Sequence, residues 1–120
     1  MFPHALHHVQ IAMPPERETE ARQFYGDLLG LEEEEKPVEL AGRGGVWFRR
    51  GELRLHLGVE QEFRPARKAH PALGVRKLDA LAERLERAGL ALDWDESLPG
   101  LRRFYIEDPF GNRLELIEGG

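Results

Sequence analysis

The alternation of apolar and polar residues divides the chain into strands and two amphipathic helices. In residues 6–13, Val9, Ile11 and Met13 share one face, which predicts a half-buried strand. Apolar residues then recur with helical spacing at Ala21, Phe24, Tyr25, Leu28 and Leu29. Gly30 follows this stripe, as is typical of the residue just past the end of a helix. The first part of the chain is therefore predicted to be a strand followed by a helix.

Three segments complete the first half of the chain. Four successive glutamates at 32–35 predict a solvated edge, and residues 46–49 predict a short strand after a glycine-rich turn. Residues 53–59 alternate, with leucines on one face, and predict another strand. The polar stretch 60–69 is expected to be a connector.

The same pattern then starts again. A short strand is expected at residues 70–75, and a second helical stripe comprises Leu78, Leu81, Ala82, Leu85 and Ala88. Gly89 closes this helix. Further strands are expected at residues 90–94, 102–107 and 112–118, the last two joined by the turn 108–111. Proline and glycine in that segment are typical of a tight turn.

The two halves can be aligned with each other. His8 and His70 open the first strand of each half, and Arg54–Leu57 matches Arg113–Leu116 at an offset of 59 positions. This order indicates a duplicated βαβββ unit and an α+β fold. We expect one domain over residues 1–120, with a first module at about 5–59 and a second at about 69–118.

Composition narrows the function. The 120 residues are 41% hydrophobic and 32% charged, as expected of a folded domain, and the net charge of −5 argues against binding to nucleic acid or to an anionic membrane. The absence of cysteine excludes disulfides, thiolate nucleophiles and cysteine-based metal sites. Neither a membrane-spanning run nor a secretory signal is recognisable, so we expect a soluble cytoplasmic protein.

Four side chains suited to metal binding are predicted to face away from the hydrophobic layer: His8, His56, His70 and Glu115. Imidazole and carboxylate groups suit Zn, Ni, Mn, Co or Fe(II), with an open position for substrate. Each histidine has a structural alternative, since histidines on strands are commonly hydrogen-bonded without binding metal.

Two assignments in this set depend on which side of a strand each residue points to. The structural alternative for Glu115 is a salt bridge to Arg113 or Arg54, which are expected to point to the same side. His7 is expected to point to the opposite side from His8, and we interpret it as structural because Val9, on the same side as His7, has to face the helix.

Several segments resemble the vicinal oxygen chelate superfamily. They are Leu6–Val9, Phe24–Leu31 and Asp108–Leu116, and the resemblance covers about residues 4–118. The superfamily includes glyoxalase I, extradiol dioxygenases and bleomycin-resistance proteins. The resemblance implies two βαβββ modules that form a mixed, partly open, β-barrel-like sheet around a metal cleft, with the helices outside. It also implies a homodimer.

The resemblance also implies roles for individual residues. His8, His70 and Glu115 match the family's metal ligands. His56 occupies the place of a fourth ligand that is often glutamate in glyoxalases, so His56 is expected to be either a ligand or a catalytic general base. Three neutral imidazoles and one carboxylate around a divalent ion leave a net charge of +1, which favours an anionic, chelating small-molecule substrate.

Substrate-binding candidates are Gln10, Trp47, Arg103 and Tyr105. Arginine can hold a carboxylate or phosphonate through two hydrogen bonds, although surface arginines in a charge-rich protein also serve solubility. Trp47 and its neighbour Phe48 point in opposite directions, so only one of that pair can face a cleft.

These features lead to a principal hypothesis and its alternatives. The principal one is a metal-dependent enzyme with lyase or isomerase chemistry of the glyoxalase type. The alternatives are an extradiol-type dioxygenase that uses Fe(II), a metal-free binding protein of the bleomycin-resistance type, and a module that has lost turnover.

Overall fold

The chain divides into two units, Met1–Arg64 and Pro65–Gly120. The structure is a computed structural model, and it describes residues 1–119. The boundary between the units falls inside the polar stretch 60–69. No helix in residues 1–119 is both long and apolar enough to cross a membrane.

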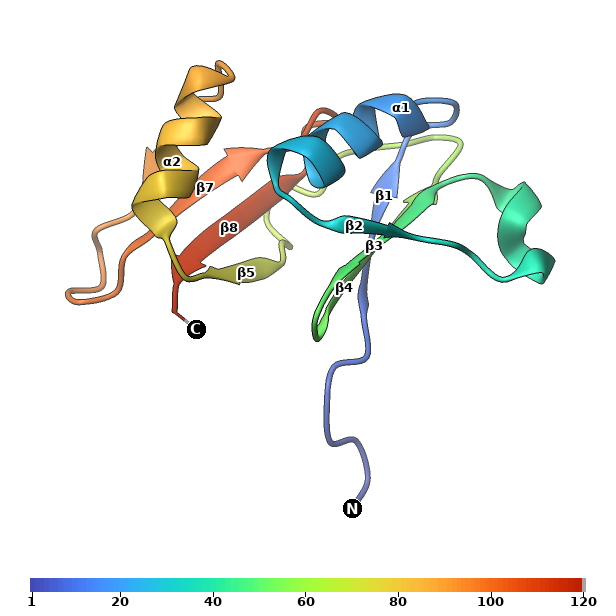
Figure 1. The fold of residues 1–120 in the computed structure, drawn as a ribbon, viewed down its shortest axis with the longest axis horizontal. Helices are drawn as coiled ribbons and strands as arrows, with labels where there is room; N and C mark the ends of the chain where they lie inside the picture. The colour runs from blue at the N-terminus through green and yellow to red at the C-terminus, as the bar shows by residue number, and fades with distance from the viewer. Residues whose placement is uncertain (120) are drawn as a thin grey trace. The chain divides into compact units, whose positions relative to one another are not determined.

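The first unit contains one four-stranded sheet, a helical segment that is part α-helix and part π-helix, and a short 3-10 helix (Figure 1). Its elements are β1 (Val9–Met13), α1 (Glu18–Ala21), η1 (Arg22–Leu28), β2 (Glu32–Glu34), η2 (Val38–Arg43), β3 (Val46–Arg50) and β4 (Leu53–Val59). The strand order is β1-β4-β3-β2, in which β1 runs parallel to β4 and the other neighbours are antiparallel. Three of the four glutamates predicted to form a solvated edge make up β2, an edge strand of this sheet.

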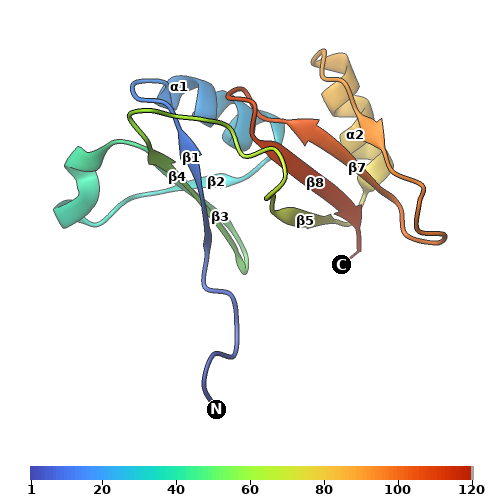
Figure 2. The ribbon, with the colours of Figure 1, turned by 180° about the vertical axis from the view of Figure 1, so that it is seen from behind.

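The second unit repeats this arrangement. Its elements are β5 (Ala72–Val75), α2 (Leu78–Arg87), β6 (Asp93–Trp94), β7 (Arg103–Glu107) and β8 (Arg113–Glu118). The strand order is β5-β8-β7-β6, again with only the first and last strands of the unit parallel (Figure 2). The predicted βαβββ duplication and the α+β class are therefore confirmed. Both sheets are open and neither closes into a barrel.

Each sheet buries one face beneath its own helix. In the first unit, Leu55 and Leu57 of β4 and Phe48 of β3 are almost fully buried, as are residues of the helical segment. In the second unit, Phe104, Ile106, Leu114 and Leu116 lie beneath Leu78, Ala82 and Leu85 of α2. Each such aliphatic side chain contributes about 1.5–3 kcal/mol on burial. Strand alternation consequently places polar side chains on the opposite face of each sheet.

Two strands begin later than the sequence predicted. β1 begins at Val9 rather than residue 6, because its ladder with β4 starts at the pair Val9–Leu55. β5 begins at Ala72 rather than His70, since Pro71 has no backbone N–H to donate. The Pro71 carbonyl instead accepts a hydrogen bond from the Glu115 N–H at 3.0 Å. His8 and His70 therefore both lie just before the first strand of their unit.

The first helix also differs from the prediction. Only Glu18–Ala21 are α-helical, and Arg22–Leu28 form a π-helix in which the Leu29 N–H donates to the Phe24 carbonyl at 2.9 Å. Gly26 weakens the preference for an α-helix in this segment, and the wider turn leaves both Phe24 and Tyr25 buried. The strand predicted over 90–94 is likewise shortened to β6.

The turn between β7 and β8 is held by its own side chains. The Asp108 carboxylate accepts hydrogen bonds from the N–H groups of Phe110 and Asn112, at 2.9 and 2.8 Å. The Asn112 side-chain carbonyl accepts the Ala66 N–H at 3.1 Å. Asp108 and Asn112 are buried, so this turn fixes the start of β8, two residues before Glu115.

Candidate metal and substrate site

His56 occupies the middle of β4, on the face opposite Leu55 and Leu57. Its ring is stacked between two others: the ring centroids are 4.3 Å from His8 and 4.0 Å from Trp47. Trp47 is the residue directly opposite His56 on β3. Only 4% of His56 is exposed, because these two rings cover it. Strand pairing thus fixes the orientation of the imidazole.

Burial, followed by the charge of His8, lowers the pKa of His56 below its ordinary value of 6.5. The ring is therefore neutral at pH 7. Neutral imidazole is the form that binds a metal ion. The same shift makes His56 a weaker base than an ordinary histidine.

Glu115 occupies the corresponding position of the second unit, in the middle of β8. The residue is 6% exposed, and its carboxylate has two partners: His70 Nε2 lies 2.9 Å from Oε1, and Arg103 Nη1 donates to Oε2 at 3.2 Å. The salt-bridge partner is therefore Arg103, not Arg113 or Arg54 as the alternative interpretation expected.

The hydrogen bonds of His70 are informative about metal binding. Its Nδ1 lies 2.8 Å from the Lys68 main-chain carbonyl, which can only accept, so Nδ1 carries a proton. Its Nε2 points at the Glu115 carboxylate, also an acceptor. His70 Nδ1 donates to a main-chain carbonyl, as in many metal-binding histidines, and Nε2 is the nitrogen that faces the Glu115 carboxylate.

The duplication gives the two units equivalent donor pairs. Tyr105 lies opposite Glu115 as Trp47 lies opposite His56, and the Tyr105 ring contacts His70 edge-on at 5.4 Å. Each unit thus places two of the predicted ligands beside an aromatic ring. Imidazole and carboxylate are donor groups that suit divalent transition metals such as zinc, nickel or iron. Within residues 1–119, no group of three or more His, Asp or Glu side chains lies together in a way that could hold a metal ion.

His7 is placed differently from His8. It is exposed, meets the His8 ring edge-on at 5.2 Å and has its Nδ1 3.0 Å from that of His8. His8, and not His7, makes the stacking contact with His56.

Gln10 and Trp47 lie together beside a cavity of about 250 Å³ in the first unit. Gln10 is opposite His56 in the parallel ladder. Its side chain extends over Gly58, where an added Cβ would lie 2.7 Å from the Gln10 Nε2. Lys36 and Arg43 also line this cavity, so it carries positive charge.

Arg103 is held by two carboxylates. Besides Glu115, its Nη2 donates to Asp95 at 3.0 Å, and 16% of its side chain is exposed. Hydrogen bonds from Ser97 lower the pKa of Asp95, which keeps this partner charged. Sequence reasoning missed Asp95 because it lies in a loop after β6, outside the alternating pattern.

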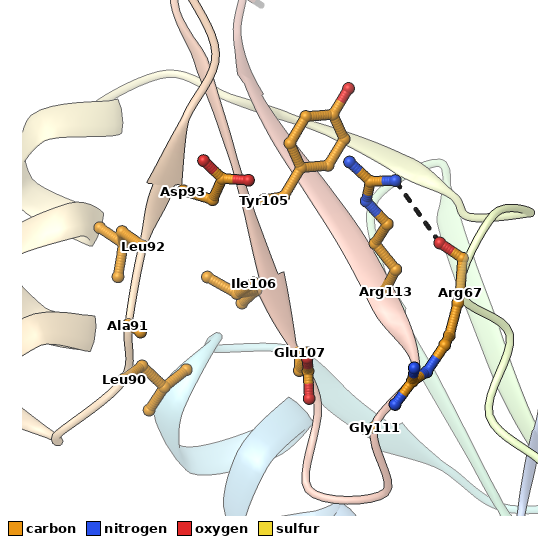
Figure 3. Close-up of a pocket in the computed structure, with 10 residues that line it drawn as sticks. All are labelled: Arg67, Leu90, Ala91, Leu92, Asp93, Tyr105, Ile106, Glu107, Gly111 and Arg113. Carbon is orange, nitrogen blue, oxygen red and sulfur yellow. Dashed lines mark hydrogen bonds between the residues drawn. The ribbon is translucent and has the colours of Figure 1, made fainter.

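A hollow of about 690 Å³ lies beside Tyr105 in the second unit (Figure 3). The Arg113 guanidinium is stacked over the Tyr105 ring, 3.9 Å from its centroid. Arg67, Asp93 and Glu107 also line the hollow. Sequence reasoning considered Arg113 only as a partner for Glu115, although its parity with Glu115 already placed it on this face.

Comparisons with known proteins were made for the whole chain. Residues 5–116 match the profile of the Glyoxalase/Bleomycin resistance protein/Dioxygenase superfamily. A glyoxalase family protein from Bacillus anthracis is 46% identical, with a TM-score of 0.96 over 100% of this chain and 98% of that one. No curated protein matches the chain.

Two more distant structures share the fold. A lactoylglutathione lyase from Agrobacterium tumefaciens is 22% identical with a TM-score of 0.75, covering 99% of this chain and 96% of that one. The fosfomycin resistance protein FosX from Listeria monocytogenes is 16% identical with a TM-score of 0.78, at the same coverage of both chains.

Proposed function

Because the chain belongs to the glyoxalase/bleomycin resistance protein/dioxygenase superfamily, we propose that it is a metal-dependent enzyme with lyase or isomerase chemistry. Its substrate is a small anionic molecule that offers two oxygen atoms to the ion. The observation that carries this proposal is the pairing of His70 Nε2 with Glu115 while Nδ1 is held by the Lys68 carbonyl.

The proposed ligands are His8, His56, His70 and Glu115. A bound divalent ion supplies Lewis-acid stabilisation of negative charge on a substrate oxygen. We assign His56 to this set rather than to proton transfer, because its lowered pKa makes it a poor base and its stacking holds the ring in place. Arg103 positions the Glu115 carboxylate.

The remaining predicted residues are assigned to the substrate. Trp47 and Tyr105 each present a ring beside one donor pair, and Gln10 adds an amide next to Trp47. Arg103, already paired with two carboxylates, contributes to substrate binding chiefly by keeping Glu115 in place.

Elemental analysis tests the metal site. The purified protein is expected to bind a divalent ion, and His70→Ala is expected to weaken that binding by at least about tenfold without unfolding the protein. His4→Ala, which removes an exposed imidazole that is not one of the predicted ligands, is the matched control. Undiminished metal binding by His70→Ala would refute the proposed site.

A second pair of variants separates the two roles of His56. If His56 is a ligand, His56→Ala lowers metal affinity, and His56→Glu restores it with a carboxylate donor. If His56 is instead the base, His56→Ala keeps its metal and loses only turnover.

Activity assays with the loaded protein distinguish the reaction classes. Metal-dependent turnover of lactoylglutathione would support the lyase and isomerase class, with zinc, nickel, cobalt or manganese as the ion. Iron content together with oxygen uptake on catechol would replace this proposal by the dioxygenase. Bleomycin binding by a protein that takes up no divalent ion would replace it by the metal-free binding protein.

We propose further that the protein is a homodimer in the cytoplasm. Membership of the superfamily supports the dimer, since members with one such domain per chain are often dimeric. Light scattering after size-exclusion chromatography is expected to give twice the mass of one chain, and a monomeric mass would contradict it.

A further inference from the structure

Two arginines share the face of the second sheet that carries Glu115, and their surroundings differ. Arg103 has both of its terminal nitrogens committed to the carboxylates of Asp95 and Glu115. Arg113 makes no ion pair with any of residues 1–119, although only part of it is exposed. Among the arginines beside Glu115, Arg113 therefore has positive charge available for a ligand.

The Arg113 guanidinium is held in place without being neutralised. Its central carbon lies over the Tyr105 ring, and its Nη1 contacts the Arg67 main-chain carbonyl at 3.5 Å, the dashed line in Figure 3. Cation–π stacking fixes the plane of a guanidinium but leaves its in-plane N–H groups free to donate. A preorganised fork of this kind suits a planar carboxylate.

The hollow beside Arg113 has an apolar side and a charged side. Leu90, Leu92 and Ile106 line the first. Two cationic and two anionic side chains line the second: Arg67, Arg113, Asp93 and Glu107. The formal charges of these four side chains sum to zero. A bound monoanion therefore gives the hollow a net charge of −1, whereas a dianion gives it −2. The hollow is therefore suited to an apolar group that carries a single carboxylate.

Tyr105 links the hollow to the proposed metal ligands of this unit. Tyr105, which carries Arg113 on its ring, is the cross-strand partner of Glu115 and contacts His70. A molecule anchored at Arg113 thus extends along the face that presents the His70–Glu115 pair.

From this geometry we infer that Arg113, stacked on Tyr105, binds the monoanionic carboxylate end of the substrate, with its apolar body in the hollow lined by Leu90, Leu92 and Ile106. This inference rests on the proposed function for the identity of the ligand as substrate. Tyr105 is a positioning residue in this assignment, because it orients the guanidinium.

The test uses phenylacetate, which combines an apolar ring with one carboxylate, titrated into the metal-free full chain and followed by NMR. Binding is expected, with shifts at residues of the hollow. Arg113→Gln is expected to weaken it about tenfold or more, the usual loss for a charge-assisted hydrogen bond. Arg113→Lys keeps the positive charge but lacks the two parallel N–H groups of a guanidinium, so we expect a smaller loss of phenylacetate affinity. Arg87→Gln, exposed on α2 and paired with Glu83, is the control.

Two further measurements make the inference falsifiable. Phenylphosphonate as a dianion is expected to bind more weakly than phenylacetate, and Tyr105→Leu is expected to weaken phenylacetate binding where Tyr105→Phe does not. Equal affinity of wild type and Arg113→Gln, or tighter binding of the phosphonate, would overturn the inference.

Zinc binding by the same variants separates this inference from the proposed function. Arg113→Gln is expected to retain zinc affinity, since it is not one of the proposed ligands. Phenylacetate binding in a protein that takes up no zinc would overturn the proposed function alone. Zinc binding with no effect of Arg113→Gln on phenylacetate would overturn the assignment of Arg113 alone.

Discussion

At the scale of single residues, Gly45 shows how tightly β3 approaches β4. Its φ is +82°, and an added Cβ would lie 2.2 Å from the Leu57 carbonyl oxygen. Gly45→Ala is therefore expected to destabilise the protein by about 3 kcal/mol or more, since a strained φ costs about 1–3 kcal/mol before the clash is added. Urea denaturation measures the loss.

Gly51 provides the matched control for this prediction. It also has a positive φ, +58°, but an added Cβ would meet nothing within 4 Å. Gly51→Ala is expected to cost only about 1–2 kcal/mol, the strain of the left-handed backbone alone. Equal losses of unfolding free energy for the two variants would show that the backbone near Leu57 can move to accommodate the added methyl group without a free-energy cost.

The residue scale also shows what sequence can and cannot predict. The facing directions of Trp47 and Phe48 follow from strand alternation, a local property, and the structure shows Phe48 buried and Trp47 against His56. The pairing of Arg103 with Asp95 depends on the path of a loop, which no periodicity encodes. The proposed metal ligands stay a prediction that awaits metal analysis.

At the scale of elements, the helical segment is tied to β3 by one carboxylate. Glu18 Oε2 accepts the Gly45 N–H at 2.9 Å, and this bond lowers the pKa of Glu18 below its ordinary value of 4.5. A depressed carboxyl pKa stabilises the folded state above pH 4.5, and the gain is lost as pH falls through the folded-state value.

Glu18→Gln tests this connection. At pH 7 the variant is expected to lose about 1 kcal/mol, because a charge-assisted hydrogen bond becomes a neutral one. The difference in unfolding free energy from wild type is expected to shrink as pH falls below 4.5. A difference that is constant between pH 7 and 3 would mean that the charge of Glu18 does not contribute.

The order of the elements was more predictable than their limits. Periodicity located both helical stripes and every strand except β2, whose glutamates bury no face, and it did not predict η2. It did not predict the π-helix, which depends on how Gly26 and two adjacent aromatic residues are accommodated. Nor did it predict the late start of β5, where Pro71 interrupts the ladder although the apolar pattern continues.

At the scale of the whole molecule, duplication explains why the candidate ligands come in two matched pairs. A βαβββ unit has one polar face, and its parallel first and last strands place their side chains next to each other on that face. His8 with His56 and His70 with Glu115 are the two outcomes of that rule. The relation was visible in the sequence because the offset between the halves is nearly constant.

The proposal of one shared ion predicts how metal binding stabilises the protein. Zinc at about one hundred times its Kd is expected to raise the unfolding free energy by about 2.7 kcal/mol. His8→Ala and Glu115→Gln are both expected to abolish most of this increment, because the proposed ligand set draws on both units. Thermal or urea unfolding with and without zinc measures it, and His4→Ala should retain the full increment. If only one of the two ligand variants lost it, the ion would be held by a single unit, and each donor pair would have to be treated as a separate site.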